Sequence, residues 1–158
     1  MPIAPPPGHP QITPTLMYAD VPGAIDWIEK AFGFMTKVRI EDGDGNVVHC
    51  ELEYGTGAVS LGGPTPEARA PGQIDGLYTS SLYIFVDDIE AHYARAKGAG
   101  ARIIRELESA EYGDRNYGCE DPEGHLWYFG QRIDQQAWDD SLAEHDVVTK
   151  ARATGEGS

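Results

Sequence analysis

Apolar and polar positions in the first half of the chain predict a strand, a helix and then three more strands. Residues 12–18 alternate between apolar and polar side chains, which favours a strand. A helix is predicted over residues 21–32, because Asp20 is a typical N-cap residue, Pro22 suits a first helical turn and Gly33 follows the last apolar position. Three strands are then expected at residues 36–41, 47–54 and 58–61.

The same order recurs in the second half of the chain. Asp88 begins a second helix, and strands are predicted at residues 80–86, 102–107, 112–119 and 125–130. Asp20-Val21 is matched by Asp88-Ile89 68 residues later. After the helices the offset is 67, and it relates Gly33, Glu53, Gly57 and Gly63 to Gly100, Glu120, Gly124 and Gly130. A duplicated βαβββ unit is therefore predicted, since neither half can bury its sheet alone.

The segments outside these units differ in composition. Residues 1–10 are rich in proline and are predicted to form an extended arm. The domain proper is expected over residues 11–132, with module one at about 11–63, a linker at 64–79 and module two at about 80–132. In residues 133–158, Trp138 and Leu142 are spaced for a short helix, and the remainder is expected to be a disordered tail.

Charge and composition exclude several classes of function. With 26 acidic and 12 basic residues the chain has a net charge of −14, which repels nucleic acid and anionic membranes. No apolar run is long enough to cross a membrane and no signal peptide is visible, so the expected location is the cytoplasm. Cys50 and Cys119 are too few for a disulfide framework and lack zinc-site spacing.

Three stretches of the sequence resemble one known family, namely residues 18–34, 86–92 and 112–129, the last containing Asp121-Pro-Glu-Gly124. They are similar to the vicinal oxygen chelate superfamily, which includes glyoxalases, extradiol dioxygenases, fosfomycin-resistance enzymes and bleomycin-binding proteins. The resemblance covers residues 11–132. It implies an α+β fold in which two βαβββ modules form a curved, partly closed mixed sheet around a ligand groove, with the helices outside. It also implies a homodimer.

The resemblance further implies where a metal would be bound. Metal-dependent members carry ligands on the first and last strand of each module, and the matching residues are Thr13, Leu61, Ser81 and Tyr128. None of these side chains is a good ligand for a divalent metal, so glyoxalase and dioxygenase chemistry is disfavoured. No cofactor is predicted, and a metal could bind only through a ligand set displaced from the usual positions.

Strand alternation predicts which side chains line the groove. The predicted ligand-binding residues on the strands are Thr13, Met17, His49, Glu51, Leu61, Ser81, Tyr83, Phe85, Asn116 and Tyr128. A mainly apolar and aromatic surface with a few polar groups is typical of a small-molecule site.

Two polar pairs were open to more than one interpretation. His49 and Glu51 share a strand face, so they could act as an acid–base pair or a partial metal site, or form a solvated surface. Arg115 could bind an anionic group at the groove mouth with Asp114 orienting it, or these two residues could set a turn and pair across strands.

The favoured function is the binding of a small aromatic or amphipathic molecule in a metal-free groove, with a drug-sequestering or resistance role. The alternative is a lyase, isomerase or dioxygenase-type enzyme with a displaced metal or acid–base site around His49 and Glu51. Whether the protein is an enzyme stays open at this point, because one fold hosts many functions. A regulatory or accessory domain is a third interpretation.

Overall fold

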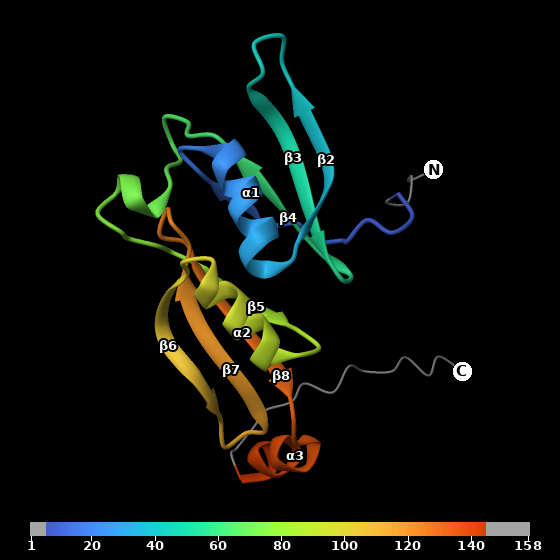
Figure 1. The fold of residues 1–158 in the computed structure, drawn as a ribbon. Coiled ribbons are helices and arrows are strands. Elements are labelled where there is room, and N and C mark those ends of the chain that lie inside the picture. Colours follow the sequence, from blue (N-terminus) through green and yellow to red (C-terminus); the bar gives the residue numbers. More distant parts are fainter. Residues whose placement is uncertain (1–5, 145–158) are drawn as a thin grey trace.

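The computed structural model describes residues 6–144, and its elements repeat the predicted order (Figure 1). The first module comprises β1 (Thr15–Met17), α1 (Val21–Phe32), β2 (Met35–Glu41), β3 (Val47–Tyr54) and β4 (Gly57–Gly62). A 3-10 turn at Pro71–Gln73 lies in the linker. The second module comprises β5 (Ser81–Phe85), α2 (Ile89–Gly98), β6 (Arg102–Ser109), β7 (Asp114–Glu120) and β8 (Leu126–Arg132).

A last helix, α3 (Gln135–Glu144), follows the second module. The indole of Trp138 on this helix lies 6.2 Å from the ring of Tyr112, so α3 rests against the end of the second sheet. No helix within residues 6–144 has the length and apolar character that a membrane span requires. The predicted disordered tail at the end of residues 133–158 and the first half of the predicted arm, residues 1–5, lie outside the described residues.

Each module forms a four-stranded mixed sheet, which confirms the predicted α+β fold. The strand orders are β1-β4-β3-β2 and β5-β8-β7-β6, and in each sheet the first strand runs parallel to the last. Thr15 pairs with Ser60 and Tyr83 pairs with Tyr128, so the two pairings are related by one offset of 68 residues. The duplication is therefore present in the strand register as well as in the order of elements.

Both helices begin at aspartate caps, as the sequence predicts. The Asp20 carboxylate accepts the N–H of Gly23 at 3.0 Å, and the Asp88 carboxylate accepts the N–H of Ala91 at 3.1 Å. The first helix ends at Gly33, whose φ of 76° is accessible to glycine at little cost. These signals fix where each helix starts, and hence which of its faces meets the sheet.

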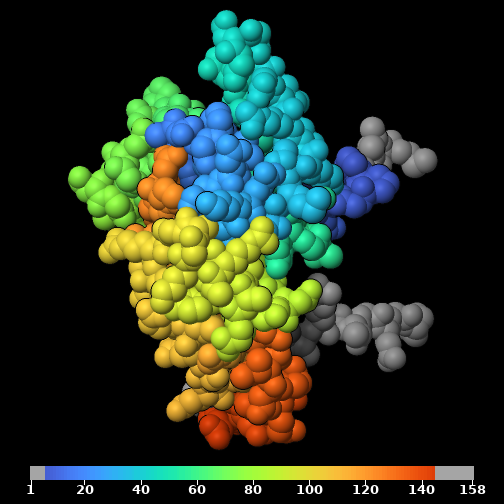
Figure 2. All heavy atoms as spheres, viewed as in Figure 1, coloured from blue at the N-terminus to red at the C-terminus, as the bar shows by residue number. Residues whose placement is uncertain are grey.

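The two modules share one hydrophobic core. The helices lie on the same side of the molecule and contact each other, and Figure 2 shows their atoms side by side on that surface. The ring of Phe32, the last residue of α1, lies 4.9 Å from Trp127 and 4.7 Å from Phe129 of the other module. All three side chains are fully buried, so separating the modules would expose them to water.

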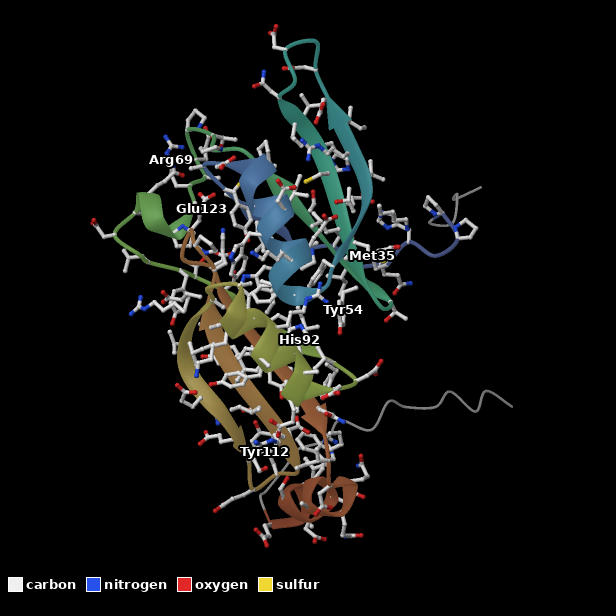
Figure 3. The ribbon with its side chains drawn as sticks, in the orientation of Figure 1. Met35, Tyr54, Arg69, His92, Tyr112 and Glu123 are labelled. Atoms are coloured by element: carbon white, nitrogen blue, oxygen red, sulfur yellow. The ribbon has the colours of Figure 1, made fainter. Side chains whose placement is uncertain are left out.

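His92 on α2 makes one hydrogen bond to α1 and one to β7. Its Nε2 donates to the carbonyl oxygen of Phe32 at 3.0 Å, and its Nδ1 accepts the hydroxyl of Tyr117 at 2.7 Å. Figure 3 shows the side chain between the two modules. Burial disfavours the imidazolium and, with the positive charge of Arg95, lowers the pKa of His92.

Asp121 makes a second connection between the modules from the turn before β8. One of its carboxylate oxygens accepts the Tyr18 hydroxyl at 2.6 Å and the Trp127 indole N–H at 3.0 Å. The other oxygen accepts the backbone N–H groups of Glu123 and His125. The Asp-Pro-Glu-Gly turn is therefore a structural motif that ties β8 to the first module.

We expect His92→Leu to lower the free energy of unfolding by about 2 kcal/mol at about pH 8, because it leaves the Tyr117 hydroxyl and the Phe32 carbonyl without their partner. The lowered pKa means that wild-type stability is full above the ordinary value of 6.5 and falls below it, by up to about 1.4 kcal/mol per pH unit. The variant lacks this loss. Urea unfolding at several pH values should show the cost of the substitution shrinking toward about pH 5.5, and a constant cost would contradict this role.

Candidate functional site

One face of each sheet is covered by helices and the other face is left open. In the first sheet, Cys50 and Leu52 are fully buried against the helices, while Glu51 between them pairs with Ser60 on the opposite face. In the second sheet, Tyr117 and Cys119 are buried in the same way. We call the opposite surfaces the open face of the first sheet and the open face of the second sheet.

Most of the predicted ligand-binding residues lie on these open faces. Strand pairing and alternation place Thr13, Met17, His49 and Glu51 on the first open face, and Ser81, Tyr83, Phe85, Asn116 and Tyr128 on the second. Whether these residues bind a ligand stays a prediction. Two of the predicted residues, Leu61 and Arg115, point the other way.

The predicted direction of Leu61 is wrong. Leu61 pairs with Leu16, and both side chains are buried in the core beneath the helices. Ser60 occupies the open face instead, beside Thr15 and Glu51. The prediction matched Leu61 to Tyr128 by the offset of 67 residues. In the structure β4 and β8 are related by an offset of 68, so Ser60 and not Leu61 corresponds to Tyr128.

Arg115 also lies on the helix side and not at a groove mouth. Its Nε donates to the carboxylate of Glu90 on α2 at 2.6 Å, and its Nη1 donates to the Ser109 hydroxyl at 3.3 Å. Asp114 and Asn116, its neighbours along β7, point to the open face because side chains alternate along a strand. The predicted anion-binding role of Arg115 with Asp114 therefore has no geometric basis.

Arg132 of β8 also lies on the second open face, and the sequence reasoning missed it. Its guanidinium forms an ion pair with the nearly buried Asp114, directly opposite in the strand register. The hydrogen bond to Asp114 raises the pKa of Arg132. The guanidinium also lies 4.4 Å from the Trp138 ring and 6.0 Å from the Phe85 ring. The turn before β8 could have revealed this pair, because residues equally far before and after the turn lie opposite each other in an antiparallel hairpin, and Asp114 and Arg132 are such residues.

A hydrogen-bonded cluster surrounds this ion pair. The Tyr83 hydroxyl donates to Asp114 Oδ2 at 3.1 Å, and the Asn116 amide donates to the Tyr112 hydroxyl at 2.7 Å and to the Tyr83 hydroxyl at 3.4 Å. Burial, together with the negative charge of Asp114, raises the pKa of Tyr83 to about 12. The end of the Tyr83 side chain occupies the space above Gly130, where a Cβ atom would overlap its hydroxyl.

The first open face carries a different polar cluster, centred on Glu51. The Nε2 atoms of His9 and His49 lie 3.3 and 3.4 Å from the same oxygen of Glu51. His9 Nδ1 also hydrogen-bonds to the Pro10 carbonyl, and this bond, with the contact to Glu51, raises the pKa of His9. The contact with His9 and that with His49 lower the pKa of Glu51. The sequence had suggested His49 and Glu51, but it gave no reason to place His9 beside them.

The residues at the family's metal positions do not fit a metal. With Ser60 in place of Leu61, the four side chains are three alcohols and one phenol, at Thr13, Ser60, Ser81 and Tyr128. Neutral hydroxyl groups alone do not hold a divalent ion. Within residues 6–144 no three His, Cys, Asp or Glu side chains are arranged to hold one either, the Glu51 cluster included.

Two cavities lie in the described part of the chain, and the smaller one also touches Tyr83 of the second open face. One, of about 490 Å³, lies among α1, the linker and the turn before β8, and its lining includes Trp27, Gly72 and Glu123. The other, of about 230 Å³, lies at the seam between the modules and includes Phe34 and Leu82. Neither of these two cavities is lined by Asn116 or Tyr128.

Comparison with known proteins establishes the family. The model of the Glyoxalase/Bleomycin resistance protein/Dioxygenase superfamily matches residues 9–129. The chain belongs to this superfamily. The curated relative Mb0911c of Mycobacterium bovis, an uncharacterized protein, is 30% identical over 140 residues, which cover 85% of this chain and 91% of the relative.

Solved structures show the same fold. TioX from Micromonospora sp. ML1 is 28% identical, with a TM-score of 0.64 over 79% of this chain and 98% of TioX. TnmS3, an antibiotic binding protein from Streptomyces sp. CB03234, is 20% identical, with a TM-score of 0.61 over 84% of this chain and 98% of TnmS3. The TnmS3 likeness shows a shared fold and no more.

We expect Arg132→Met to lower the free energy of unfolding by about 2–3 kcal/mol, because it strands the Asp114 carboxylate in a nearly buried position. Arg105→Met removes an exposed ion pair with Glu108 and should cost less than about 1 kcal/mol. Urea unfolding of both variants makes the comparison. Equal costs would show that the ion pair with the nearly buried Asp114 is no more important than an exposed one.

Proposed function

We propose that the open face of the second sheet binds a small aromatic or amphipathic molecule without a metal, in a drug-sequestering or resistance role. The observation that carries the proposal is the exposure of two adjacent aromatic rings beside a fixed polar cluster. Tyr83 is 45% exposed and Phe85 is 57% exposed, with ring centroids 5.4 Å apart. Beside them, Asp114 and Arg132 are held by one another. Aromatic surface with a few fixed polar groups is the usual composition of a small-molecule site.

The charge of the chain narrows the class of ligand. A net charge of −14 raises the local concentration of cations and lowers that of anions near the surface. On the open face itself, Arg132 is neutralised by Asp114, and Arg105, which pairs with Gly118 in the strand register, is neutralised by Glu108. These guanidinium groups therefore leave no unpaired positive charge to attract an acid. A neutral or cationic aromatic molecule therefore suits this face better than an anionic one.

The comparisons are consistent with this proposal, but they are not the evidence for it. TnmS3 is described as an antibiotic binding protein, so this fold accommodates such binding in at least one neighbour. At 20% identity, that function does not transfer to this chain. The proposal is supported by the residues of the open face and by the poor fit of the family's metal positions to a metal.

A second copy of the chain would turn the open faces into a groove. Large apolar side chains remain exposed on them, namely Met35 and Ile40 on the first sheet and Tyr83 and Phe85 on the second. The strands β1 and β5 are edge strands with one side unpaired. A homodimer that covers these surfaces is therefore part of the proposal.

The Glu51 cluster favours a second candidate function, an enzyme using acid–base chemistry. Two imidazoles share one carboxylate oxygen, and Glu51 itself is only 15% exposed. A histidine held by a carboxylate can accept or donate a proton near neutral pH. In this candidate the ligand bound at the open faces would be chemically changed, whereas in the first it would be released unchanged.

We expect 9-aminoacridine, a flat aromatic cation, to bind at least about tenfold more tightly than acridine-9-carboxylate, its anionic counterpart. Phe85→Ala should weaken binding of the cation by about tenfold or more, because it removes an exposed aromatic contact. Tyr78→Ala, which removes a half-exposed aromatic ring from the linker, is the matched control and should have no effect. Fluorescence titration measures all of these affinities.

Tighter binding of the anion, or equal loss in both variants, would contradict the proposed site. Mass spectrometry of the recovered ligand separates the two candidate functions. An unchanged ligand supports sequestration. Conversion by the wild type that is lost in His49→Gln would favour the enzyme.

Native mass spectrometry of protein purified without chelator tests the metal-free dimer. The expected species has twice the chain mass of 17.2 kDa and carries no bound metal. Stoichiometric nickel, zinc, manganese or iron would contradict the metal-free site. A monomer at micromolar concentration would contradict the groove between copies.

A further inference from the structure

Asn116 lies on the second open face and carries a buried oxygen atom that has no hydrogen-bond partner in the described part of the chain. The residue is only 1% exposed, and the unpaired atom is its Oδ1. The side-chain nitrogen of Asn116 donates the two hydrogen bonds described above, to the Tyr112 and Tyr83 hydroxyls. Buried amide oxygens nearly always accept a hydrogen bond. An unpaired one on a face proposed to bind a ligand therefore favours a ligand that carries a hydrogen-bond donor.

The hydrogen bonds around Tyr83 fix the orientation of this carboxamide. The single hydroxyl hydrogen of Tyr83 is donated to Asp114 Oδ2, because a carboxylate can only accept. The Tyr83 oxygen can therefore only accept from Asn116, so the NH₂ group faces it. A rotated amide would set two acceptors against each other, and the unpaired atom is therefore the oxygen.

Tyr83 is placed to act as a gate over this group. Its phenol end lies above Gly130, and Gly130 pairs directly with Asn116 in the strand register. The side chain comes from the edge strand β5 and is half exposed, and its bond to Asn116 is long at 3.4 Å. When the ring turns toward solvent, an Asn116 N–H is released near the oxygen that is already free.

We propose that Asn116 is the hydrogen-bonding recognition residue of the ligand site, with Tyr83 as its gate. The ligand is then a flat heteroaromatic ring that carries a lactam-type N–H and C=O side by side. The N–H donates to Asn116 Oδ1 and the C=O accepts the released N–H, the pairing by which asparagine side chains read adenine edges. This inference rests on the proposed function, since it names the ligand class of the same face.

The walls around Asn116 suit a flat ring. On one side the phenol ring of Tyr128 lies over Gly118, where a Cβ atom would overlap the ring. On the other side Phe85 and Trp138 flank the Arg132 guanidinium. Aromatic rings stack on both kinds of surface, so the walls supply contact area and Asn116 supplies the polar selection.

The test uses quinolin-2(1H)-one and its N-methyl derivative, which differ in the one N–H group. We expect the full-length wild type to bind the N–H compound about tenfold more tightly, because only that compound pairs with the buried oxygen. In Asn116→Leu the preference should fall to within about twofold, since both partners of the hydrogen bond are then absent. Tyr83→Phe, which keeps the ring and removes its hydroxyl, should retain the preference and bind at least as tightly.

Proton–nitrogen NMR of the wild type keeps the test independent of how the variants fold. The side-chain NH₂ signals of Asn116 should shift with the N–H compound and stay nearly unchanged with the N-methyl compound. A shift with both compounds, or with neither, would overturn the inference.

The outcomes also separate this inference from the proposed function. If 9-aminoacridine binds and both quinolinones bind equally or not at all, the face binds aromatic molecules but Asn116 does not select them, and only the inference fails. If the face binds none of these compounds and Phe85→Ala changes nothing, the proposed function fails with it.

Discussion

The packing of α1 against α2 around Phe32 determines what the rest of the molecule can do. The Phe32 ring is buried between aromatic side chains of the second module, and its carbonyl oxygen is held by His92. Because both helices are used in this one contact, each covers the inner face of its own sheet and neither reaches the other face. Two open faces follow from that geometry, and with them the exposed Tyr83 and Phe85.

The open faces differ in chemistry although the modules are copies of one unit. His49 and Asn116 occupy matching positions on β3 and β7, but one is half exposed beside a carboxylate and the other is buried beneath tyrosines. Glycine explains part of the difference, since Gly118 and Gly130 leave room for Tyr128 and Tyr83 to lie across the second sheet. The acid–base candidate function rests on the chemistry of the first face, and the proposed binding of an aromatic molecule rests on that of the second.

Much of the fold could be predicted from the sequence, because its signals are local. The Asp20 and Asp88 caps and the repeat of strand and helix patterns required only neighbouring residues. Leu61 was misplaced because a shift of one residue in strand register reverses the direction of every side chain. Arg115 was placed at the groove mouth although alternation with Asn116 turns it to the other face, and its partner Glu90 lies far away in sequence. His9 and the unpaired oxygen of Asn116 depend on tertiary packing, which no local pattern contains.

The central claim is that the ligand binds on the open face of the second sheet, and not in the larger cavity beside α1. Backbone amide NMR during titration with 9-aminoacridine tests this most directly. We expect the largest shift changes at Tyr83, Phe85, Asn116 and Tyr128. Changes concentrated instead at Trp27, Gly72 and Glu123, which line the 490 Å³ cavity, would contradict it.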